Sequence, residues 1–436
     1  MWPHIDISVS DENEKTTEAK ESEEEKTTEA KESEEEKTLS FQFPFFLLRT
    51  KRGLTLMDKL APLKTTKIFG TTALYLFPIL AALGLVLILV NINLILFNSP
   101  VRGFVRDAGP FVHLLIPGLN PFVPLLYGWV GLIVAMVVHE GAHGILARSF
   151  KLKVRSSGLI FLAILPIGAF VDIDEEEIKK TAVRKAARVM AAGPISNIFV
   201  SIISLIGLML LVGSMVPASS GVGITGVYLD SPAYDAGILG TDTLLTLNGI
   251  TVTSGAEIQD ILSDFNPGDT ISLSFLHDGD EIERDIVLAS FNDTSRAFIG
   301  INGLDSSFIS ESLENYMGLQ SGWRFYLYIP TFASDGALYV PYSSTMNNFY
   351  TSPLGDYTFF IANILFWIWF VNVNVGAINA LPLYPLDGGQ ALKSALQSYG
   401  NTKGWKENTV KRITRVSSLL LLFIFIVIIV APYLFA

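Results

Sequence analysis

The sequence has no cysteine among its 436 residues, which excludes disulfide bonds and thiolate metal ligands. Histidine is also scarce: there are five, and two of them, His139 and His143, lie in one motif, HEGAH. Long apolar runs, in contrast, are frequent, and 50% of the residues are hydrophobic. Several of these runs reach the roughly 20 residues that a helix needs to cross a lipid bilayer. We therefore expect a multi-pass α-helical membrane protein.

Acidic residues are concentrated near the start of the chain. Residues 11–37 hold thirteen acidic and five basic residues, which accounts for eight of the eleven net negative charges. The segment is a repeat, KTTEAKESEEE at 15–25 and again at 26–36. An eleven-residue period is compatible with a helical repeat, but there is no apolar stripe to bury. We expect a solvated tail, disordered or transiently helical, and binding of a basic partner is the alternative role.

The apolar runs predict five or six membrane spans and one shorter buried segment. GLIFLAILPIGAF at 158–170 is too short for a span and contains Pro166 and two glycines, so a re-entrant or hairpin segment is expected there. The spans are expected at about 69–97, 122–147, 191–215, 355–381 and 416–434.

Lysine and arginine are distributed unevenly between these spans. Nine lie in 148–188 and five in 384–413, whereas 217–353 has no lysine and three arginines. Because basic loops stay on the cytoplasmic side, the N-terminus, 148–188 and 384–413 are predicted inside and 217–353 outside. The expected location is the cell membrane, with the HEGAH side cytoplasmic.

The outside segment has the pattern of a small soluble domain. From Gly221 to about Ala289, short apolar runs alternate with Asn-Gly and Asp-Gly turns, which predicts β-strands, and AEIQDILSDF predicts one helix. The aromatic-rich stretch 304–353 has no clear assignment, and its rings are candidates for the membrane interface.

HEGAH carries the chemistry. On a helix, His139 and His143 project from one face and can share one tetrahedral ion, with Glu140 placed to take a proton from a metal-activated water. The alternative is a pair of hydrogen-bonded structural histidines, but it would leave three ionisable groups buried in a span, which is costly.

A zinc site needs a third protein ligand, and NALPLYPLDGG at 379–389 offers Asp387. Pro382 and Pro385 interrupt the fourth span, and the two glycines that follow Asp387 permit a tight turn. At 1.5 Å per residue, Glu140 lies about 27 Å along a span that enters from outside, so both motifs are expected at the inner side. The alternative is a turn with a solvated aspartate.

In this order, HEGAH, GPISN (Gly193 to Asn197), an external insert and NALPLYPLDGG resemble the site-2 protease family of intramembrane zinc metalloproteases, peptidase M50. The resemblance covers about 120–390 except 304–353. It implies one Zn²⁺ per chain held by His139, His143 and Asp387, with Glu140 as the catalytic acid and base. Asn379 is implied to position the substrate or the developing oxyanion.

Residues 221–300 resemble a PDZ domain, in which GVGITGV loosely matches the carboxylate-binding loop. Such folds bind extended peptides by strand addition, and a passive folded insert is the alternative. LPIGAFV is expected to offer a strand edge to an unwound substrate. The expected substrate-binding residues are Gly168, Ala169, Phe170, Pro382 and Gly223.

The expected organisation has seven parts. In chain order they are an acidic disordered repeat tail (1–40), the first span with flanking loops (41–121), the first part of the catalytic membrane core (122–216), the PDZ-like domain (217–303), the aromatic-rich external segment (304–353), the second part of the core (354–395), and a C-terminal loop and span (396–436).

The expected function is zinc-dependent hydrolysis of peptide bonds within or next to the transmembrane segments of membrane-anchored, regulatory proteins. The expected partners of the protein are those substrates, the lipid bilayer and peptide termini bound at the PDZ-like domain; no nucleic acid is expected. One alternative is a catalytically silent membrane adaptor that binds partners through the PDZ-like domain. Another is a transporter with charges along its path, which does not account for the histidine spacing.

Overall fold

The computed structural model describes residues 39–50, 52–163, 165–290, 295–317 and 340–435. The acidic repeat and part of the aromatic-rich segment, 318–339, lie outside the described residues. The chain forms two compact units, one of Met1–Lys67 with His143–Thr181 and one of Ile68–Ala142 with Ala182–Ala436.

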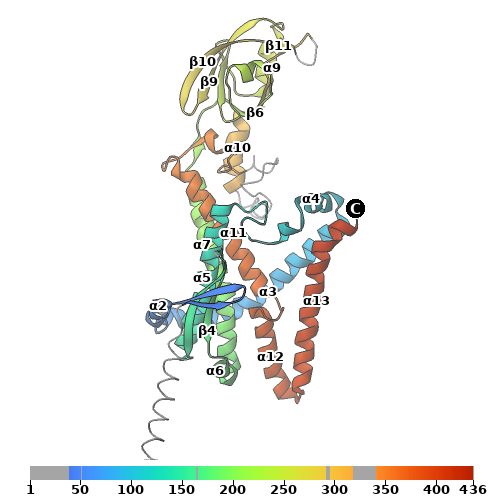
Figure 1. Cartoon of the computed structure of the whole chain (residues 1–436). Helices are drawn as coiled ribbons and strands as arrows, with labels where there is room; N and C mark the ends of the chain where they lie inside the picture. The colour runs from blue at the N-terminus through green and yellow to red at the C-terminus, as the bar shows by residue number, and fades with distance from the viewer. Residues whose placement is uncertain (1–38, 51, 164, 291–294, 318–339, 436) are drawn as a thin grey trace, which may run out of the picture. The chain divides into compact units, whose positions relative to one another are not determined.

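The smaller unit is built around a four-stranded antiparallel sheet in the order β1-β2-β3-β4 (Figure 1). The four strands are β1 (Leu39–Gln42), β2 (Phe45–Thr50), β3 (Val154–Leu162) and β4 (Leu165–Ile173). Gly158 is required in β3, because a Cβ there would lie 2.2 Å from the carbonyl oxygen of Leu48. The short helices α2 (Arg52–Leu60) and α6 (Glu175–Lys180) complete the unit.

The predicted buried segment at 158–170 is therefore a β-hairpin. β3 and β4 pair in antiparallel register, with Leu162 opposite Leu165. The strands β1 and β2, which precede the first span, extend the same sheet and were not expected from the sequence.

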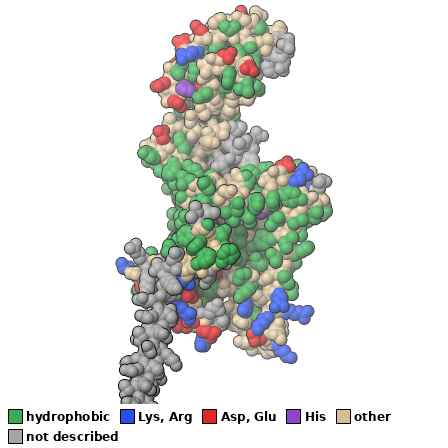
Figure 2. Space-filling model, viewed as in Figure 1, with side chains coloured by type: hydrophobic (Ala, Val, Ile, Leu, Met, Phe, Trp, Pro, Cys, Tyr) green, Lys and Arg blue, Asp and Glu red, His purple; other side chains and the backbone are tan. Residues whose placement is uncertain are grey.

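Five helices among the described residues are long and apolar enough to cross a membrane, as the sequence predicted, which confirms the multi-pass helical class. They are α3 (Lys64–Phe97), α5 (Leu125–Ser149), α7 (Val183–Val212), α11 (Tyr357–Asn379) and α13 (Glu407–Leu434). Buried residues make up 39–50% of the apolar window in α5, α7 and α11, but 17% in α3 and α13. Helices α5, α7 and α11 are thus more enclosed than α3 and α13. Apolar side chains cover much of the visible surface of the molecule (Figure 2).

Glycines allow the three enclosed helices to approach closely. A Cβ at Gly131 of α5 would lie 2.6 Å from the carbonyl oxygen of Trp367 in α11, and one at Gly376 of α11 would lie 2.8 Å from that of Pro194 in α7. Small residues at helix contacts are typical of membrane bundles, where backbones pack directly against each other.

The larger unit contains two further helices, α4 and α12, that the sequence did not predict as separate elements. α4 (Ser99–Ala108) follows α3, with Asn98 capping its first turn through the amide of Val101. α12 (Asp387–Lys403) follows α11 and ends at Gly404, which has a positive φ of 70°.

The PDZ-like domain contains a sheet in the order β10-β9-β7-β6-β13, with β8 (Ile250–Thr251) also paired to β7. The strands are β6 (Val222–Val227), β7 (Thr243–Leu247), β9 (Thr270–His277), β10 (Asp280–Val287) and β13 (Ile301–Leu304). Helix α9 (Gly255–Ser263) occupies the predicted AEIQDILSDF segment, and α8 (Pro232–Asp235) is a single turn. The two-residue strands β11 (Ala289–Ser290) and β12 (Ala297–Phe298) pair with each other.

The chain connects the PDZ-like domain to α11 through α10 (Ser306–Met317) and the segment from Val340 onward. The 3₁₀ turn η5 (Asn347–Phe349) precedes β14 (Tyr350–Thr351), which pairs with β5 (Val216–Pro217). The buried hydroxyls of Tyr316 and Tyr342 share a 2.5 Å hydrogen bond, and burial raises the pKa of both phenols above its usual range. These tyrosines therefore remain neutral, and their hydrogen bond joins α10 to the later part of the aromatic-rich segment.

Candidate metal centre

Helix α5 presents two histidines one turn apart. His139 and His143 are both buried, with 6% and 7% of their surfaces exposed. The boundary between the two units falls between Ala142 and His143, but α5 is one continuous helix, so its own geometry fixes their spacing. Glu140, next to His139, is half-buried.

Asp387 completes a cluster with the two histidines. One ligand atom from each of the three residues lies within 4.8 Å of the others, an arrangement that could hold one metal ion. Nε2 of His139 is 2.9 Å from Oδ2 of Asp387, and the Asp387 side chain is 12% exposed. Imidazole and carboxylate are ligands that Zn²⁺ accepts, and three protein ligands leave the fourth position open, as in catalytic sites.

The loop that ends α11 determines where Asp387 lies. Helix α12 begins at Asp387, so this carboxylate lies at a helix N-terminus, where the partial positive charge favours an anion. A Cβ at Gly388 would lie 2.2 Å from the carbonyl oxygens of both Ala380 and Leu381, and one at Gly389 would lie 2.3 Å from the amide of Tyr384. The two glycines thus let α12 pack directly on the loop before it.

Asn197 of α7 contacts the His139 ring at the nitrogen that does not face Asp387. Its side chain is fully buried, and Nδ2 lies 3.2 Å from Nδ1 of His139. Its Oδ1 is buried without a hydrogen-bond partner among the described residues. Rotation of the amide by half a turn brings Oδ1 to the imidazole, where it accepts a hydrogen bond from Nδ1–H.

This second orientation is the one that fits a metal. A neutral histidine that binds an ion through Nε2 carries its proton on Nδ1 and donates it to a neighbouring acceptor. The partnerless oxygen of Asn197 is such an acceptor, so the residues present suit a bound ion. The GPISN motif contains Asn197 but by itself assigns it no role; a polar amide within an apolar span is the signal that points to one.

The remaining predicted residues lie in separate places. Asn379 is in the last turn of α11, where Nδ2 donates to the carbonyl oxygen of Val375 at 3.1 Å. Pro382 lies in the loop between α11 and α12 and is half-buried. Gly168, Ala169 and Phe170 lie in β4, which among the residues that the structure describes is the outermost strand of its sheet, with one edge not paired to another strand.

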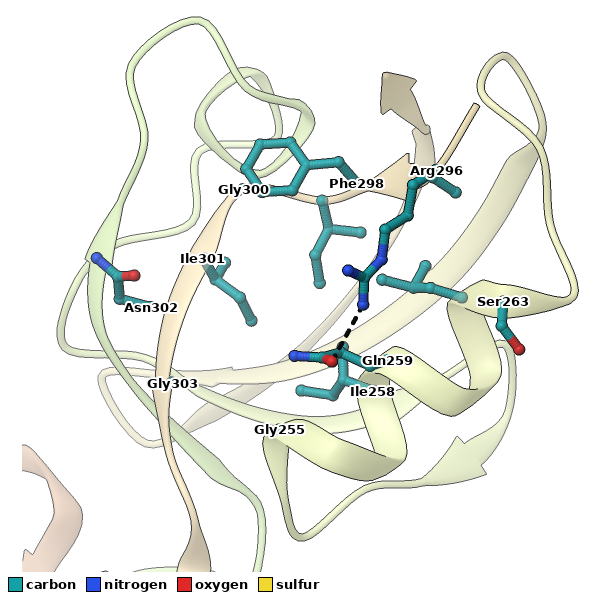
Figure 3. A pocket seen from close by; sticks show the side chains of 13 residues that line it. Gly255, Ile258, Gln259, Ser263, Arg296, Phe298, Gly300, Ile301, Asn302 and Gly303 are labelled. Atoms are coloured by element: carbon teal, nitrogen blue, oxygen red, sulfur yellow. Dashed lines mark hydrogen bonds between the residues drawn. The ribbon is translucent and has the colours of Figure 1, made fainter. Parts of the chain in front are cut away.

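The PDZ-like domain contains a groove of about 320 Å³ between α9 and the segment 296–303 (Figure 3). Arg296 donates from Nη2 to Oε1 of Gln259 across the groove at 3.1 Å. Strand β13, on the other wall, is the last strand of its sheet. Gly300, with a φ of +89°, opens the turn that leads into it.

Gly223 is not among the residues that line this groove. It lies in β6, where a Cβ would be 3.0 Å from both Ile309 of α10 and Phe349 of η5, so the segment that connects the domain to α11 covers that face. The structure therefore locates the groove at RAFIGING (296–303) rather than at the GVGITGV segment named from the sequence.

The fold and the cluster define a multi-pass membrane protein with a candidate His-His-Asp metal centre and an inserted β-rich domain. The chain belongs to Peptidase family M50, which it matches over residues 127–424. It is 26% identical over 218 residues to the zinc metalloprotease RasP of Shouchella clausii, covering 48% of this chain and 50% of RasP. It is 35% identical over 164 residues to the uncharacterised protein MJ0971 of Methanocaldococcus jannaschii, covering 37% of this chain and 42% of that protein. The chain thus spans half or less of the length of these curated relatives.

Among solved structures, the chain is similar to PDZ domains from two Listeria species. That of an SdrC-like protein from Listeria monocytogenes is 26% identical and covers 20% of this chain and 90% of the domain, with a TM-score of 0.19. That of an SdrC-like protein from Listeria innocua is 25% identical, covers 19% of this chain and 92% of the domain, and has a TM-score of 0.18.

Proposed function

We propose that the protein is a zinc-dependent intramembrane endopeptidase that hydrolyses peptide bonds within or next to the transmembrane segments of membrane-anchored, regulatory proteins. The observation that carries this proposal is the convergence of His139, His143 and Asp387, with ligand atoms within 4.8 Å. The histidines lie on α5 and Asp387 follows α11, and both of these helices are apolar enough to span a membrane. Membership of Peptidase family M50 supports it.

One Zn²⁺ bound by His139, His143 and Asp387 would polarise the scissile carbonyl and activate water at neutral pH. Glu140 is adjacent in sequence to His139 on α5, and we assign it the proton transfers. Its carboxylate takes a proton from the attacking water and then delivers it to the departing amide nitrogen, which leaves as an amine. Asn379 is proposed to orient the scissile carbonyl.

The substrate must be extended before its peptide bond is accessible, because a helix keeps its carbonyls in internal hydrogen bonds. The free edge of β4 at Gly168, Ala169 and Phe170 is a candidate for strand addition to the unwound substrate. Pro382, in the loop before Asp387, is a candidate contact to the same segment.

The groove between α9 and β13 is proposed to bind extended peptide termini. A peptide there would add as a strand along β13, the last strand of its sheet among the described residues, and the Arg296 guanidinium, which already donates to Gln259, lies in the lining where it can also donate to a carboxylate. The distribution of lysine and arginine supports a cytoplasmic N-terminus and metal centre and an extracytoplasmic PDZ-like domain in the cell membrane.

The test uses purified full-length protein and a model single-span substrate in liposomes. Glu140→Gln is expected to retain about one zinc per chain while cleavage falls at least about a hundredfold. His143→Ala is expected to lose both metal and cleavage. Glu311→Gln, an exposed glutamate of α10, is the matched control and should match the unmodified protein.

Undiminished cleavage by Glu140→Gln would overturn the proposed mechanism. An adaptor that uses the PDZ-like domain would bind partners equally well with or without zinc and would cleave nothing. A transporter would move a solute or ion across the liposome membrane, which the same preparation can report.

A further inference from the structure

A second hollow, of about 430 Å³, lies between α13 and the loop that precedes Asp387. It belongs to the larger unit alone and contains none of the three cluster residues. Its lining changes from charged to apolar along α13, and it includes Tyr384, Lys393, Lys411, Arg415, Leu419 and Leu422.

The charged end of the hollow is basic. Lys393 comes from α12, and Lys411 and Arg415 are one turn apart on α13. Nζ of Lys393 lies 5.3 Å from the centre of the Tyr384 ring, and Lys411 pairs with Glu407 at 2.8 Å. Lysine and arginine side chains gather over the lower ends of α12 and α13 (Figure 2). Three cations and no acid are among the residues that line the hollow, and Glu407 outside the lining pairs with one of the three, so this end suits a phosphate.

The other end of the hollow is apolar and exposed. Leu419 and Leu422, one and two turns beyond Arg415, are 57% and 48% exposed. They belong to the apolar part of α13, the span whose window is 17% buried. A ligand that fits both ends needs an anionic head and a hydrocarbon chain, since a free phosphate would leave the leucine surface uncovered.

The hollow is also joined to the loop that carries Asp387. The amide of Tyr384 donates to Oγ of Ser418 at 2.9 Å, and Oγ of Ser417 donates to the carbonyl oxygen of Pro382 at 3.3 Å. Tyr384 and Ser418, which both line the hollow, thus connect the loop before α12 to α13. A molecule bound there would hold this loop against α13.

We propose that this hollow binds an anionic phospholipid, with its phosphate between Lys393, Lys411 and Arg415 and one acyl chain along Leu419 and Leu422. Bound lipid restrains the loop at 380–386. The binding site stands without the proposed peptidase function; only an effect of lipid on cleavage would rest on it. Basic pockets between helices on the cytoplasmic side are where anionic headgroups bind, in agreement with the predicted orientation.

The test measures lipid retained by the purified full-length protein in detergent, by native mass spectrometry. Phosphatidylglycerol is compared with phosphatidylcholine of the same chains and with inorganic phosphate. We expect phosphatidylglycerol to bind at least about tenfold more tightly than phosphatidylcholine, and the double variant Lys411→Gln, Arg415→Gln to lose this preference. The matched control is Lys403→Gln, Arg412→Gln, which removes one exposed lysine and one exposed arginine from the same helices outside the hollow.

Hydrogen exchange of the Tyr384 amide provides a second readout. Phosphatidylglycerol should slow exchange in the unmodified protein and in the control, but not in the Lys411, Arg415 variant. Equal affinity for the two lipids, or an equal loss in both double variants, would overturn the proposal. If inorganic phosphate alone slows Tyr384 exchange to the same extent, the site binds free anions and the lipid assignment is wrong. Neither readout uses proteolysis, so failure here is separate from failure of the proposed function.

Discussion

The amide of Asn197 and the imidazole of His139 meet in the interior of the helix bundle, with 3.2 Å between Nδ2 and Nδ1. The two residues lie on different spans, α7 and α5, and both are buried. This contact fixes the orientation of the ring whose other nitrogen, Nε2, points to Asp387.

Replacing Asn197 should weaken metal binding without removing a ligand. Asn197→Leu is expected to lower zinc affinity by about 10–100-fold, because His139 loses the group that orients it. Asn197→Asp, which can only accept from Nδ1–H, should retain most of the affinity. Competition with a chromogenic chelator measures the zinc affinity of each variant. The control is Asn374→Leu, because Nδ2 of Asn374 donates to the carbonyl oxygen of Phe370 one turn earlier on the same helix. If Asn197→Leu binds zinc as tightly as this control, Asn197 does not support the metal site.

Gly388→Ala should displace Asp387. The new Cβ would meet two backbone carbonyl oxygens at 2.2 Å, and a backbone cannot rotate away as a side chain can. We expect a loss of stability of about 1–3 kcal/mol together with weaker zinc binding. Thermal unfolding and metal content report the two effects.

Gly103→Ala is the control for that substitution. Gly103 lies in α4 with nothing within 4 Å of a new Cβ, so alanine should be neutral or stabilising by up to about 1 kcal/mol. Equal behaviour of the two variants would show that the loop before α12 is not tightly packed.

The groove beside α9 predicts recognition of a free carboxylate. A fluorescent peptide with a free C-terminus should bind the full-length protein more tightly than its amidated form. Arg296→Gln should remove most of this difference, because the guanidinium is the cation at the groove. Fluorescence anisotropy measures both affinities, and Arg284→Gln, on β10 away from the groove, is the control. An amidated peptide that binds equally well would contradict this use of Arg296.

His277 predicts a pH-dependent contribution to stability in the PDZ-like domain. Nδ1 of His277 lies 2.9 Å from Oδ1 of the buried Asp242, and this hydrogen bond and the charge of Asp242 raise the pKa of His277 above 6.5; the charges of Asp278 and Asp280 raise it further. A raised pKa means that the folded state favours the protonated ring. The stabilisation is therefore fully present below pH 6.5 and is lost as pH rises through the raised pKa.

Thermal midpoints of the unmodified protein and His277→Gln across pH 5.5–9 test this. The difference between them should be largest at low pH and shrink towards alkaline pH. Asp278→Asn, an exposed neighbour of the ring, should show a smaller change. If the thermal midpoints of the unmodified protein and His277→Gln differ by the same amount at every pH, His277 does not contribute a pH-dependent stabilisation.

Local patterns predicted much of this fold. Apolar runs indicated the five spans, and the Asp278-Gly279 turn joins β9 and β10 as expected. The HEGAH spacing needs only a helix to bring His139 and His143 to one face. The position of Asp387 was predicted from a different feature: two prolines end the apolar span before it, and two glycines after it permit a tight turn.

The features that the sequence did not reveal depend on contacts between distant segments. β1 and β2 resemble an ordinary apolar loop until β3, more than a hundred residues later, pairs with β2 and so adds their hairpin to a larger sheet. Asn197 has no recognisable role until α7 packs against α5. The groove at Arg296 requires α9 and β13 to face each other, which no single stretch of residues encodes.

The pairing of β2 with β3 also constrains how the protein is made. Phe45 of β2 lies opposite Leu162 of β3, and two hydrophobic helices, α3 and α5, separate them along the chain. During synthesis, β2 cannot pair with β3 until both helices have been inserted and the ribosome has passed residue 162. The hairpin of β1 and β2 therefore remains unpaired on its side of the bilayer until then. Only an even number of crossings returns the chain to that side, so a failed insertion of either helix would leave this N-terminal hairpin without its partner.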